Sequence, residues 1–250
     1  MVPKINVYLS DELADAVKEA GLSVSAICQR ALEQAVGRVI AIREATANGT
    51  VTFGLNDQMG THFTKRAYNM VVSAAEDAGT QGQALGTAHL LRSILLEREN
   101  LAVRVLTSME IEPEELAHAL YERVKAGAVE GAADGAAEGE VSVSSSARAV
   151  LQLAATEATS LGHNYIGSEH LLLGMVAEPD GVAGEVLRAA GLELRQVRRS
   201  VVAALAGYQH LRANAATKPA MPSDPIAALN SAISAQLAPI VERLNRLEQR

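Results

Sequence analysis

The stretch Leu161-Gly-His-Asn-Tyr-Ile-Gly-Ser-Glu-His-Leu-Leu-Leu-Gly-Met175 decides the fold, because part of it occurs twice. Gly86-Thr-Ala-His-Leu-Leu91 matches Gly167-Ser-Glu-His-Leu-Leu172, which lies 81 residues further along the chain. Each copy follows a segment rich in small residues, at 67–78 and at 147–158. A loop, a histidine and a preceding segment that recur together predict an internal duplication.

Each copy carries the signals of a helix start. A glycine interrupts the chain, Thr87 or Ser168 can accept hydrogen bonds from free backbone N–H groups, and an apolar run follows. His89 and His170 occupy the same position in the two copies, so we expect both to pack beneath a helix cap. His163 has no counterpart, and no paired-cysteine or His-Glu-x-x-His spacing occurs, so we predict no metal site.

The composition is that of a globular protein built from helices. Apolar residues make up 48% of the 250 residues, but aromatic residues only 3%, so the core must consist of small and aliphatic side chains. The single Cys28 cannot form an intramolecular disulfide, and no leader or long apolar segment is visible. We therefore expect a cytoplasmic protein with no membrane partner. The net charge of −7 gives no general attraction to nucleic acid, although a local surface can still bind DNA.

The N-terminal region has a pattern of its own. Residues 4–9 alternate polar and apolar side chains, which predicts a short strand. Two helices follow; Ser10 is a good N-cap for the first, and the second begins near Ser23 or Ser25 and continues to about residue 47. A unit this small buries too little apolar surface to fold alone, so we expect it to dimerise.

This order of elements resembles the ribbon-helix-helix DNA-binding fold, in which two strands pair across a dimer and lie in the major groove. The resemblance implies that Lys4, Asn6 and Tyr8 face base edges and that the amides near Ser23 and Ser25 hold a phosphate. The alternative is that these side chains are the solvated face of an edge strand and that the unit only dimerises.

The duplicated region resembles a second family. Gly167-Ser-Glu-His-Leu-Leu-Leu-Gly174 after His163-Asn-Tyr-Ile166, and Phe63-Thr-Lys-Arg-Ala67 in the first copy, are similar to the double-repeat N-terminal domain of the Clp unfoldases, above all ClpC. The resemblance implies a mainly α protein. It would consist of an all-helical Clp N-terminal double repeat, preceded by the small ribbon-helix-helix unit with one short strand and followed by a C-terminal amphipathic helix.

The predicted organisation follows from composition shifts along the chain. Residues 1–47 form the ribbon-helix-helix-like unit, and 48–60 a linker with a short strand at 51–53. The double repeat spans 61–208, as 61–125 and 141–208 around a Gly- and Ala-rich acidic linker at 126–140. A proline-containing linker at 209–225 precedes 226–250, where apolar residues at three- and four-residue spacing predict an amphipathic helix.

Motor chemistry is not expected from these 250 residues. The AAA+ modules of Clp unfoldases contain a P-loop, Gly-x-x-x-x-Gly-Lys-Ser/Thr, and none of the five lysines here follows a glycine. No Gly-x-Ser-x-Gly nucleophile elbow occurs either. We therefore expect a recognition protein that is not an enzyme and needs no cofactor.

The ClpC resemblance implies two candidate ligand sites. A groove between the repeats, used in the family for adaptors and cyclic peptide antibiotics, corresponds to Val71, Val72, Val143, Arg148, Gln152 and Ala155. A phosphoarginine site corresponds to Ser144 and Glu169, whereas the first repeat has Ala88 in place of the acid. The alternatives are ordinary packing between the repeats for the groove, and stabilisation of a helix N-terminus by Glu169.

Three functions remain open at this stage. The first is a decoy or sensor that binds peptide-like ligands, including cyclic peptide antibiotics that target ClpC, while its N-terminal homodimer binds DNA and represses transcription. The second is an adaptor or competitor of the ClpC protease system, with ClpC or its adaptors as partners and an N-terminal unit that only dimerises. The third is a reader of phosphorylated arginine.

Overall fold

The computed structural model describes residues 6–53, 59–128, 130–132 and 140–216, and side chains as far as residue 207. In chain order the elements are α1 (Asp11–Glu19), α2 (Val24–Ala45), β1 (Thr50–Thr52), the short 3-10 helix η1 (Gly60–His62), α3 (Lys65–Thr80), α4 (Thr87–Leu96), α5 (Leu101–Ser108), α6 (Pro113–Lys125), β2 (Glu140–Ser142), α7 (Ser145–Ser160), α8 (Ser168–Ala177), α9 (Val182–Ala189) and α10 (Leu194–Ala216). Met1–Ala204 form one compact unit and Leu205–Arg250 a second.

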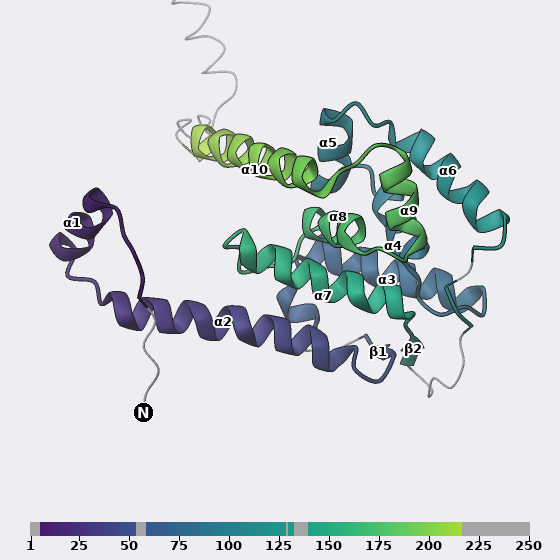
Figure 1. Ribbon diagram of the computed structural model, residues 1–250, viewed down its shortest axis with the longest axis horizontal. Coiled ribbons are helices and arrows are strands. Elements are labelled where there is room, and N and C mark those ends of the chain that lie inside the picture. The colour runs from purple at the N-terminus through teal and green to yellow at the C-terminus, as the bar shows by residue number, and fades with distance from the viewer. Residues whose placement is uncertain (1–5, 54–58, 129, 133–139, 217–250) are drawn as a thin grey trace, which may run out of the picture. The chain divides into compact units, whose positions relative to one another are not determined.

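The internal duplication is confirmed by the order and length of the helices (Figure 1). Helices α3, α4 and α5 have 16, 10 and 8 residues, and α7, α8 and α9 have the same three lengths. The caps recur as well: the hydroxyl of Thr64 accepts a hydrogen bond from Ala67 N, and that of Ser144 accepts one from Ala147 N. The mainly α fold class predicted from the sequence is therefore correct.

The two repeats interlock through reciprocal backbone bonds. Thr64 N donates to the carbonyl of Ile166 at 2.9 Å, and Ser144 N donates to the carbonyl of Leu85 at 3.0 Å. The first residues of each repeat thus pair with the loop before the second helix of the other repeat. Each repeat therefore supplies a backbone partner to the first residues of the other.

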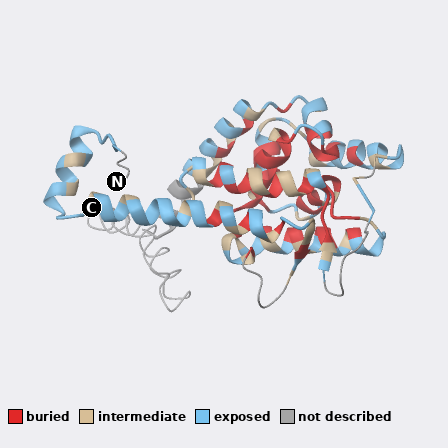
Figure 2. Ribbon diagram, turned by 60° about the horizontal axis from the view of Figure 1, so that its bottom comes forward, coloured by how far each residue is buried: buried red, intermediate tan, exposed pale blue. Residues whose placement is uncertain are grey.

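The core lies mainly between α7 and α8, which make the most extensive helix contact in the described part of the chain. Figure 2 shows the buried residues gathered in the interior of the helical body, and α4 contributes further buried side chains. Gly174 allows the close approach, because a Cβ at this position would lie 2.6 Å from the carbonyl oxygen of Val150. Aliphatic side chains fill the rest of the core, as the low aromatic content predicted; Leu85, Leu91, Leu151, Leu171 and Leu172 are at most 1% exposed.

The N-terminal helices begin at the predicted caps. Ser10 accepts from Leu13 N and Ser23 accepts from Ala26 N. The predicted strand is not formed: residues 6–10 have no strand structure, and residues 4 and 5 lie outside the described residues. A strand needs a partner for its backbone groups, and the predicted partner belongs to a second copy of the chain.

The predicted linkers contain more structure than expected. The strand predicted at 51–53 occurs as β1, which pairs antiparallel with β2, and β2 begins at Glu140, the last residue of the predicted acidic linker. Helix α10 continues through Ala216, past the predicted end of the repeat at 208, because its only helix-breaking residue is Gly207. The amphipathic helix predicted at 226–250 lies outside the described residues. No helix in the described ranges combines the length and apolar character needed to cross a bilayer.

Candidate functional site

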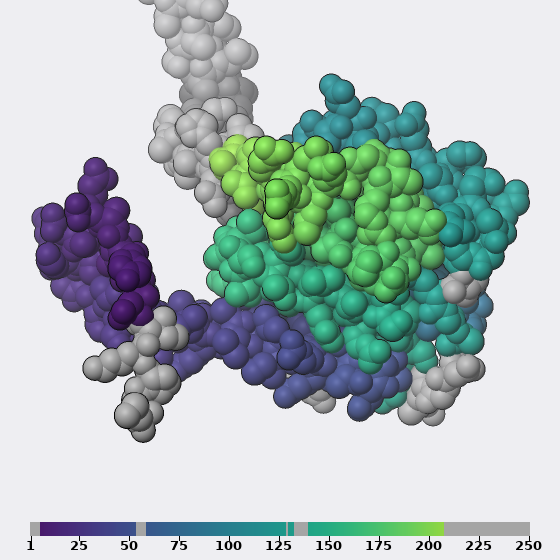
Figure 3. All heavy atoms as spheres, viewed as in Figure 1, coloured from purple at the N-terminus to yellow at the C-terminus, as the bar shows by residue number. Residues whose placement is uncertain are grey.

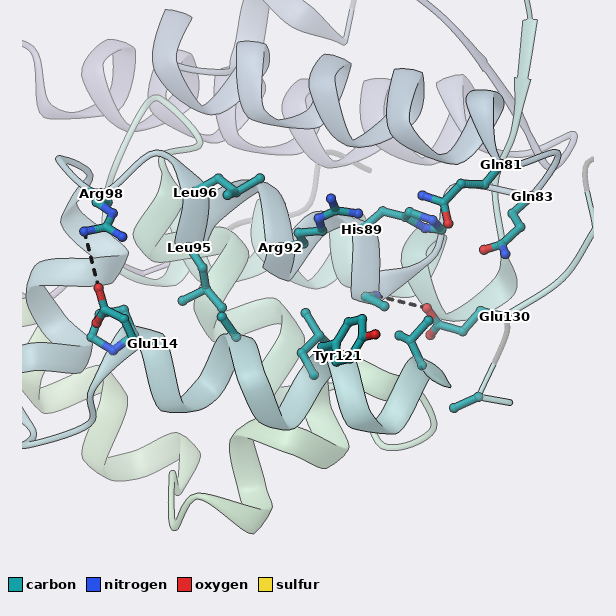
Figure 4. A pocket seen from close by; sticks show the side chains of 16 residues that line it. Gln81, Gln83, His89, Arg92, Leu95, Leu96, Arg98, Glu114, Tyr121 and Glu130 are labelled. Atoms are coloured by element: carbon teal, nitrogen blue, oxygen red, sulfur yellow. Dashed lines mark hydrogen bonds and ion pairs between the residues drawn. The ribbon is translucent and has the colours of Figure 1, made fainter. Parts of the chain in front are cut away.

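A pocket of about 360 Å³ lies between α4 and α6, and we call it the α4–α6 pocket (Figure 4). Its floor is mostly apolar and consists of Leu95, Leu96, Ala117, Leu120, Tyr121 and Val124. Leu96 is 71% exposed and Tyr121 is 60% exposed, so two large side chains of the pocket meet water rather than protein. Exposed apolar groups within a concave surface are typical of a binding site.

Ion pairs surround this apolar floor. Arg98 forms an ion pair with Glu114 at 3.3 Å, which Figure 4 shows as a dashed line. Arg92 forms a second ion pair, with Asp77 of α3, at 3.0 Å. A second cavity of about 750 Å³, between α3 and α4, shares His89, Arg92 and Leu96 with the pocket. Exposed pairs of this kind are weak, so their charged groups are available to a ligand at little cost.

Glu130 closes one end of the α4–α6 pocket. Its carboxylate accepts hydrogen bonds from the hydroxyl of Thr87 at 2.7 Å, from Ala88 N at 3.1 Å and from Val182 N at 3.2 Å. The last two donors are free amides at the starts of α4 and α9, where the helix dipoles favour a negative charge. Glu130, expected in a flexible linker, instead joins the first repeat to the second.

The second repeat has a carboxylate in the equivalent place. A Cβ built on Gly86 would lie 2.4 Å from an oxygen of Glu130, and a Cβ built on Gly167 would lie 2.4 Å from an oxygen of Glu169. Glu130 therefore supplies from the linker the acid that Ala88 lacks. Burial raises the pKa of Glu169, whose side chain is almost wholly enclosed. Its carboxylate lies in the first turn of its own helix, α8.

The recurring histidines serve as helix caps. Nδ1 of His89 accepts from Gly86 N at 3.1 Å, and Nδ1 of His170 accepts from Gly167 N at 2.9 Å. Burial lowers the pKa of His170 to about 3, with smaller contributions from His163 and Arg38, so its contact with Glu169 is not an ion pair at neutral pH. The role predicted for both histidines, beneath a helix cap, is the one they have.

One cluster deserves a test as a metal site. His163, Glu169 and His170 have ligand atoms within 4.8 Å of one another. Nε2 of His170 lies 2.8 Å from Nδ1 of His163, whereas Glu169 approaches the other ring nitrogen, Nδ1, which already accepts from the backbone. Nδ1 of His170 is held by the cap, so a metal ion would have to bind through Nε2 and replace the hydrogen bond between the two rings; as described, the cluster is a hydrogen-bonded core.

The part of the predicted groove that α7 supplies is in contact with the chain's own N-terminal helix α2. Val71, Val143 and Ala155 are buried, and Val72 is half-buried. Arg148 donates to the carbonyl of Ala47, and Gln152 donates to the hydroxyl of Thr46, so both bind the end of α2. Figure 3 shows α2 against α7 along this side. Arg148 and Gln152, two of the predicted groove residues, therefore bind the end of α2, and the groove as a ligand site stays a prediction.

The remaining predicted residues lie in different places. Asn6 and Tyr8 are exposed, Lys4 lies outside the described residues, Ser23 caps α2 and Ser25 is exposed in its first turn. Of the phosphoarginine pair, Ser144 binds the loop of the first repeat through Leu85.

Two important residues were not predicted. Glu130 stood in a Gly- and Ala-rich segment, and the only hint of its role was the missing acid at Ala88. Arg38 lies in the middle of α2, yet it is only 4% exposed and donates to the carbonyl of His163 at 2.6 Å. No local pattern marks an arginine as buried, because its partner is 125 residues away.

Comparison with known proteins identifies the family. The sequence matches the Clp repeat (R) N-terminal domain over residues 62–190 and again over 142–237. The chain therefore belongs to the Clp repeat N-terminal domain family, as its motifs predicted. The ribbon-helix-helix assignment of the first 47 residues stays a prediction.

Individual relatives agree with the family assignment. The chain is 33% identical over 167 residues to the chloroplastic chaperone protein ClpC1 of Oryza sativa subsp. japonica, covering 66% of this chain and 18% of that protein. It is 33% identical over 192 residues to the ATP-dependent Clp protease ATP-binding subunit ClpA homolog of Guillardia theta, covering 75% and 23%. The crystal structure of the N-terminal domain of ClpD from Arabidopsis thaliana has 21% identity and a TM-score of 0.46, covering 60% of this chain and 99% of that domain. The chain thus spans about a fifth of the length of the relatives it matches.

Proposed function

We propose that this protein is a non-catalytic recognition protein related to the N-terminal domain of ClpC, and that it binds peptide-like ligands in the α4–α6 pocket. The observation that carries the proposal is the apolar floor of this pocket, with Leu96 and Tyr121 exposed. Membership of the Clp repeat family supports it, because matched relatives are named as chaperones and as subunits of a Clp protease.

Apolar cyclic peptides are the ligand class that fits this floor best. They bring little backbone freedom to lose on binding, and their side chains can cover Leu96 and Tyr121. Abundant protein of this kind would lower the free concentration of such a peptide and so protect a ClpC unfoldase that the peptide targets. Protection would then depend only on affinity and on the amount of protein.

A titration of the full chain with a fluorescein-labelled apolar cyclic peptide tests the proposal. Leu96→Asp and Tyr121→Asp place a charge on the pocket floor without filling buried space, and we expect each to weaken binding at least about tenfold. Val202→Asp, on α10 and similarly exposed, is the matched control and should bind as the wild type does. Equal affinity in all four chains would refute the assignment of this pocket.

A second function, DNA binding by an N-terminal homodimer, is favoured by the exposed apolar side chains of α1, of α2 and of the turn between them. Leu13, Leu22, Ile27, Leu32 and Val36 are each at least half exposed in the single chain. A helix pair that leaves so much apolar surface in water is expected to pair with a second copy. Repression of transcription would follow from binding of Asn6 and Tyr8, with Lys4, in a major groove.

Sedimentation and DNA retardation separate this function from dimerisation alone. Ile27→Asp should convert a dimer into a monomer, whereas Gln29→Asp, on an exposed position of the same helix, should not. Asn6→Ala should abolish sequence-selective retardation while the dimer persists. If the dimer binds all DNA sequences equally, DNA recognition is excluded and the N-terminal unit serves only to dimerise, as in the adaptor function.

A further inference from the structure

The second half of α2 is held against the body by residues at regular spacing. Arg38, Ile42 and Thr46 are 4%, 0% and 0% exposed, and they recur every four residues, so they form one face of the helix. The first half of α2 is mostly exposed. The helix therefore has one docked half and one free half, as the burial colours of Figure 2 show.

The surface that receives this helix is made by polar groups, and we call it the α7 face. It consists of Arg148, Gln152 and Thr159 of α7 together with the carbonyl of His163. Arg148 and Gln152 bind the last residues of α2, where carbonyl groups lack helical partners and the dipole is negative. The α7 face thus recognises the C-terminal end of a helix.

Arg38 is an unusual anchor for a permanent core contact. One of its terminal nitrogens donates to His163 and Thr159, but its Nε, although buried, has no hydrogen-bond partner among the described residues. Its charge helps to lower the pKa of His62, of His163 and of His170, and no carboxylate in the described ranges hydrogen-bonds to it. Buried arginines are normally paired, so this contact stabilises α2 less than a satisfied one would.

Residues 46–49 connect α2 to β1. Gly49 has a φ of +75°, a left-handed conformation that suits glycine, and it lies between the end of α2 and β1. β1 is held separately by its pairing with β2. The carbonyl of Gly49 accepts a hydrogen bond from Val143 N at 2.7 Å, so Gly49 and β1 are both anchored to the second repeat, and release of α2 requires a change of backbone angles at residues 46–48.

We propose that the α7 face is a docking site for the C-terminal end of a helix and that the second half of α2 occupies this site in cis. A helical peptide with side chains like those of Arg38, Ile42 and Thr46 at the same four-residue spacing exchanges with α2. The ligand class is a helix with a cation, an aliphatic side chain and a hydroxyl side chain at four-residue intervals near its C-terminal end. This site is separate from the α4–α6 pocket, so the inference does not depend on the function proposed for that pocket.

The experiment uses the full chain and a fluorescein-labelled peptide with the sequence of residues 24–47. Arg38→Ala in the chain weakens the resident helix, so fluorescence anisotropy should show the peptide binding this variant about tenfold more tightly than the wild type. Arg43→Ala removes an exposed arginine from the same helix and should leave the affinity at the wild-type value. A peptide with its own Arg38→Ala change should bind all three chains more weakly.

Hydrogen exchange in the wild-type chain gives a second measurement that does not rely on a variant. Excess peptide should speed exchange of the amides at 38–45 at least about tenfold, since the displaced helix frays. Unchanged exchange at a peptide concentration that saturates Arg38→Ala would overturn the inference. So would equal affinity of the peptide for the wild type, Arg38→Ala and Arg43→Ala chains, or its failure to bind any of them.

Discussion

Replacing Glu130 with alanine tests whether the linker joins the two repeats. The change removes one hydrogen bond from Thr87 and two from the amides of Ala88 and Val182. Loss of a helix cap costs about 0.5–2 kcal/mol, and here two helix starts lose the same carboxylate. Because Glu130 is partly exposed and water can replace it, we expect a loss of about 2 kcal/mol in the free energy of unfolding.

Thermal unfolding followed by circular dichroism measures this loss. A cost of about 2 kcal/mol should lower Tm by about 4–8 °C in a domain of this size. Glu130→Gln keeps one acceptor oxygen and should lose about half as much. Glu140→Ala removes an exposed acid from the same segment and is the control. If Glu130→Ala shifts Tm no more than Glu140→Ala does, the reasoning about the two helix starts is refuted.

Three further predictions concern stability. The unfolded chain binds a proton at His170 below about pH 6.5, but the folded chain binds it only near its pKa of about 3. The free energy of unfolding should therefore fall as pH falls below 6.5, by up to about 1.4 kcal/mol per pH unit. In urea titrations from pH 7 to 4.5, His170→Asn should show a shallower dependence of stability on pH than the wild type, and parallel slopes would contradict this. Gly174→Ala should cost about 1–3 kcal/mol in chemical unfolding, because its Cβ meets the backbone of α7, whereas Gly37→Ala, in open space on α2, should cost nothing. Glu110 has a φ of +62°, so Glu110→Gly should raise the free energy of unfolding by about 1 kcal/mol; a lower midpoint in urea would show that the side chain matters more than the backbone.

The sequence predicted features whose signals are local. The duplicated helices, the serine and threonine caps and the capping histidines all depend on residues within a few positions of one another. Such signals suffice to define the family and the helix boundaries. The strand at 4–9 was predicted by the same reasoning, but an alternating pattern does not form a strand unless a partner strand is present.

Features that depend on distant residues were not predicted. Thr87 and Glu130 are 43 residues apart, and Arg38 and His163 are 125 apart, so only the folded chain brings them together. The groove stays a prediction, although two of its residues, Arg148 and Gln152, bind the end of α2. The contact of α2 with these residues was not predicted, because nothing in the spacing of the apolar residues of α2 distinguishes a free helix from a docked one. The α4–α6 pocket also went unpredicted, since its two helices come from separate segments of the first repeat.

Methyl NMR of the full chain during titration with an apolar cyclic peptide tests the central claim most directly. The account predicts saturable shifts of the methyl groups of Leu95, Leu96 and Leu120 on the floor of the α4–α6 pocket. Leu151 and Leu172 in the core between α7 and α8 should shift little. Shifts confined to residues outside the pocket, or no shift at any peptide concentration, would contradict the claim that this pair of repeats recognises peptides there.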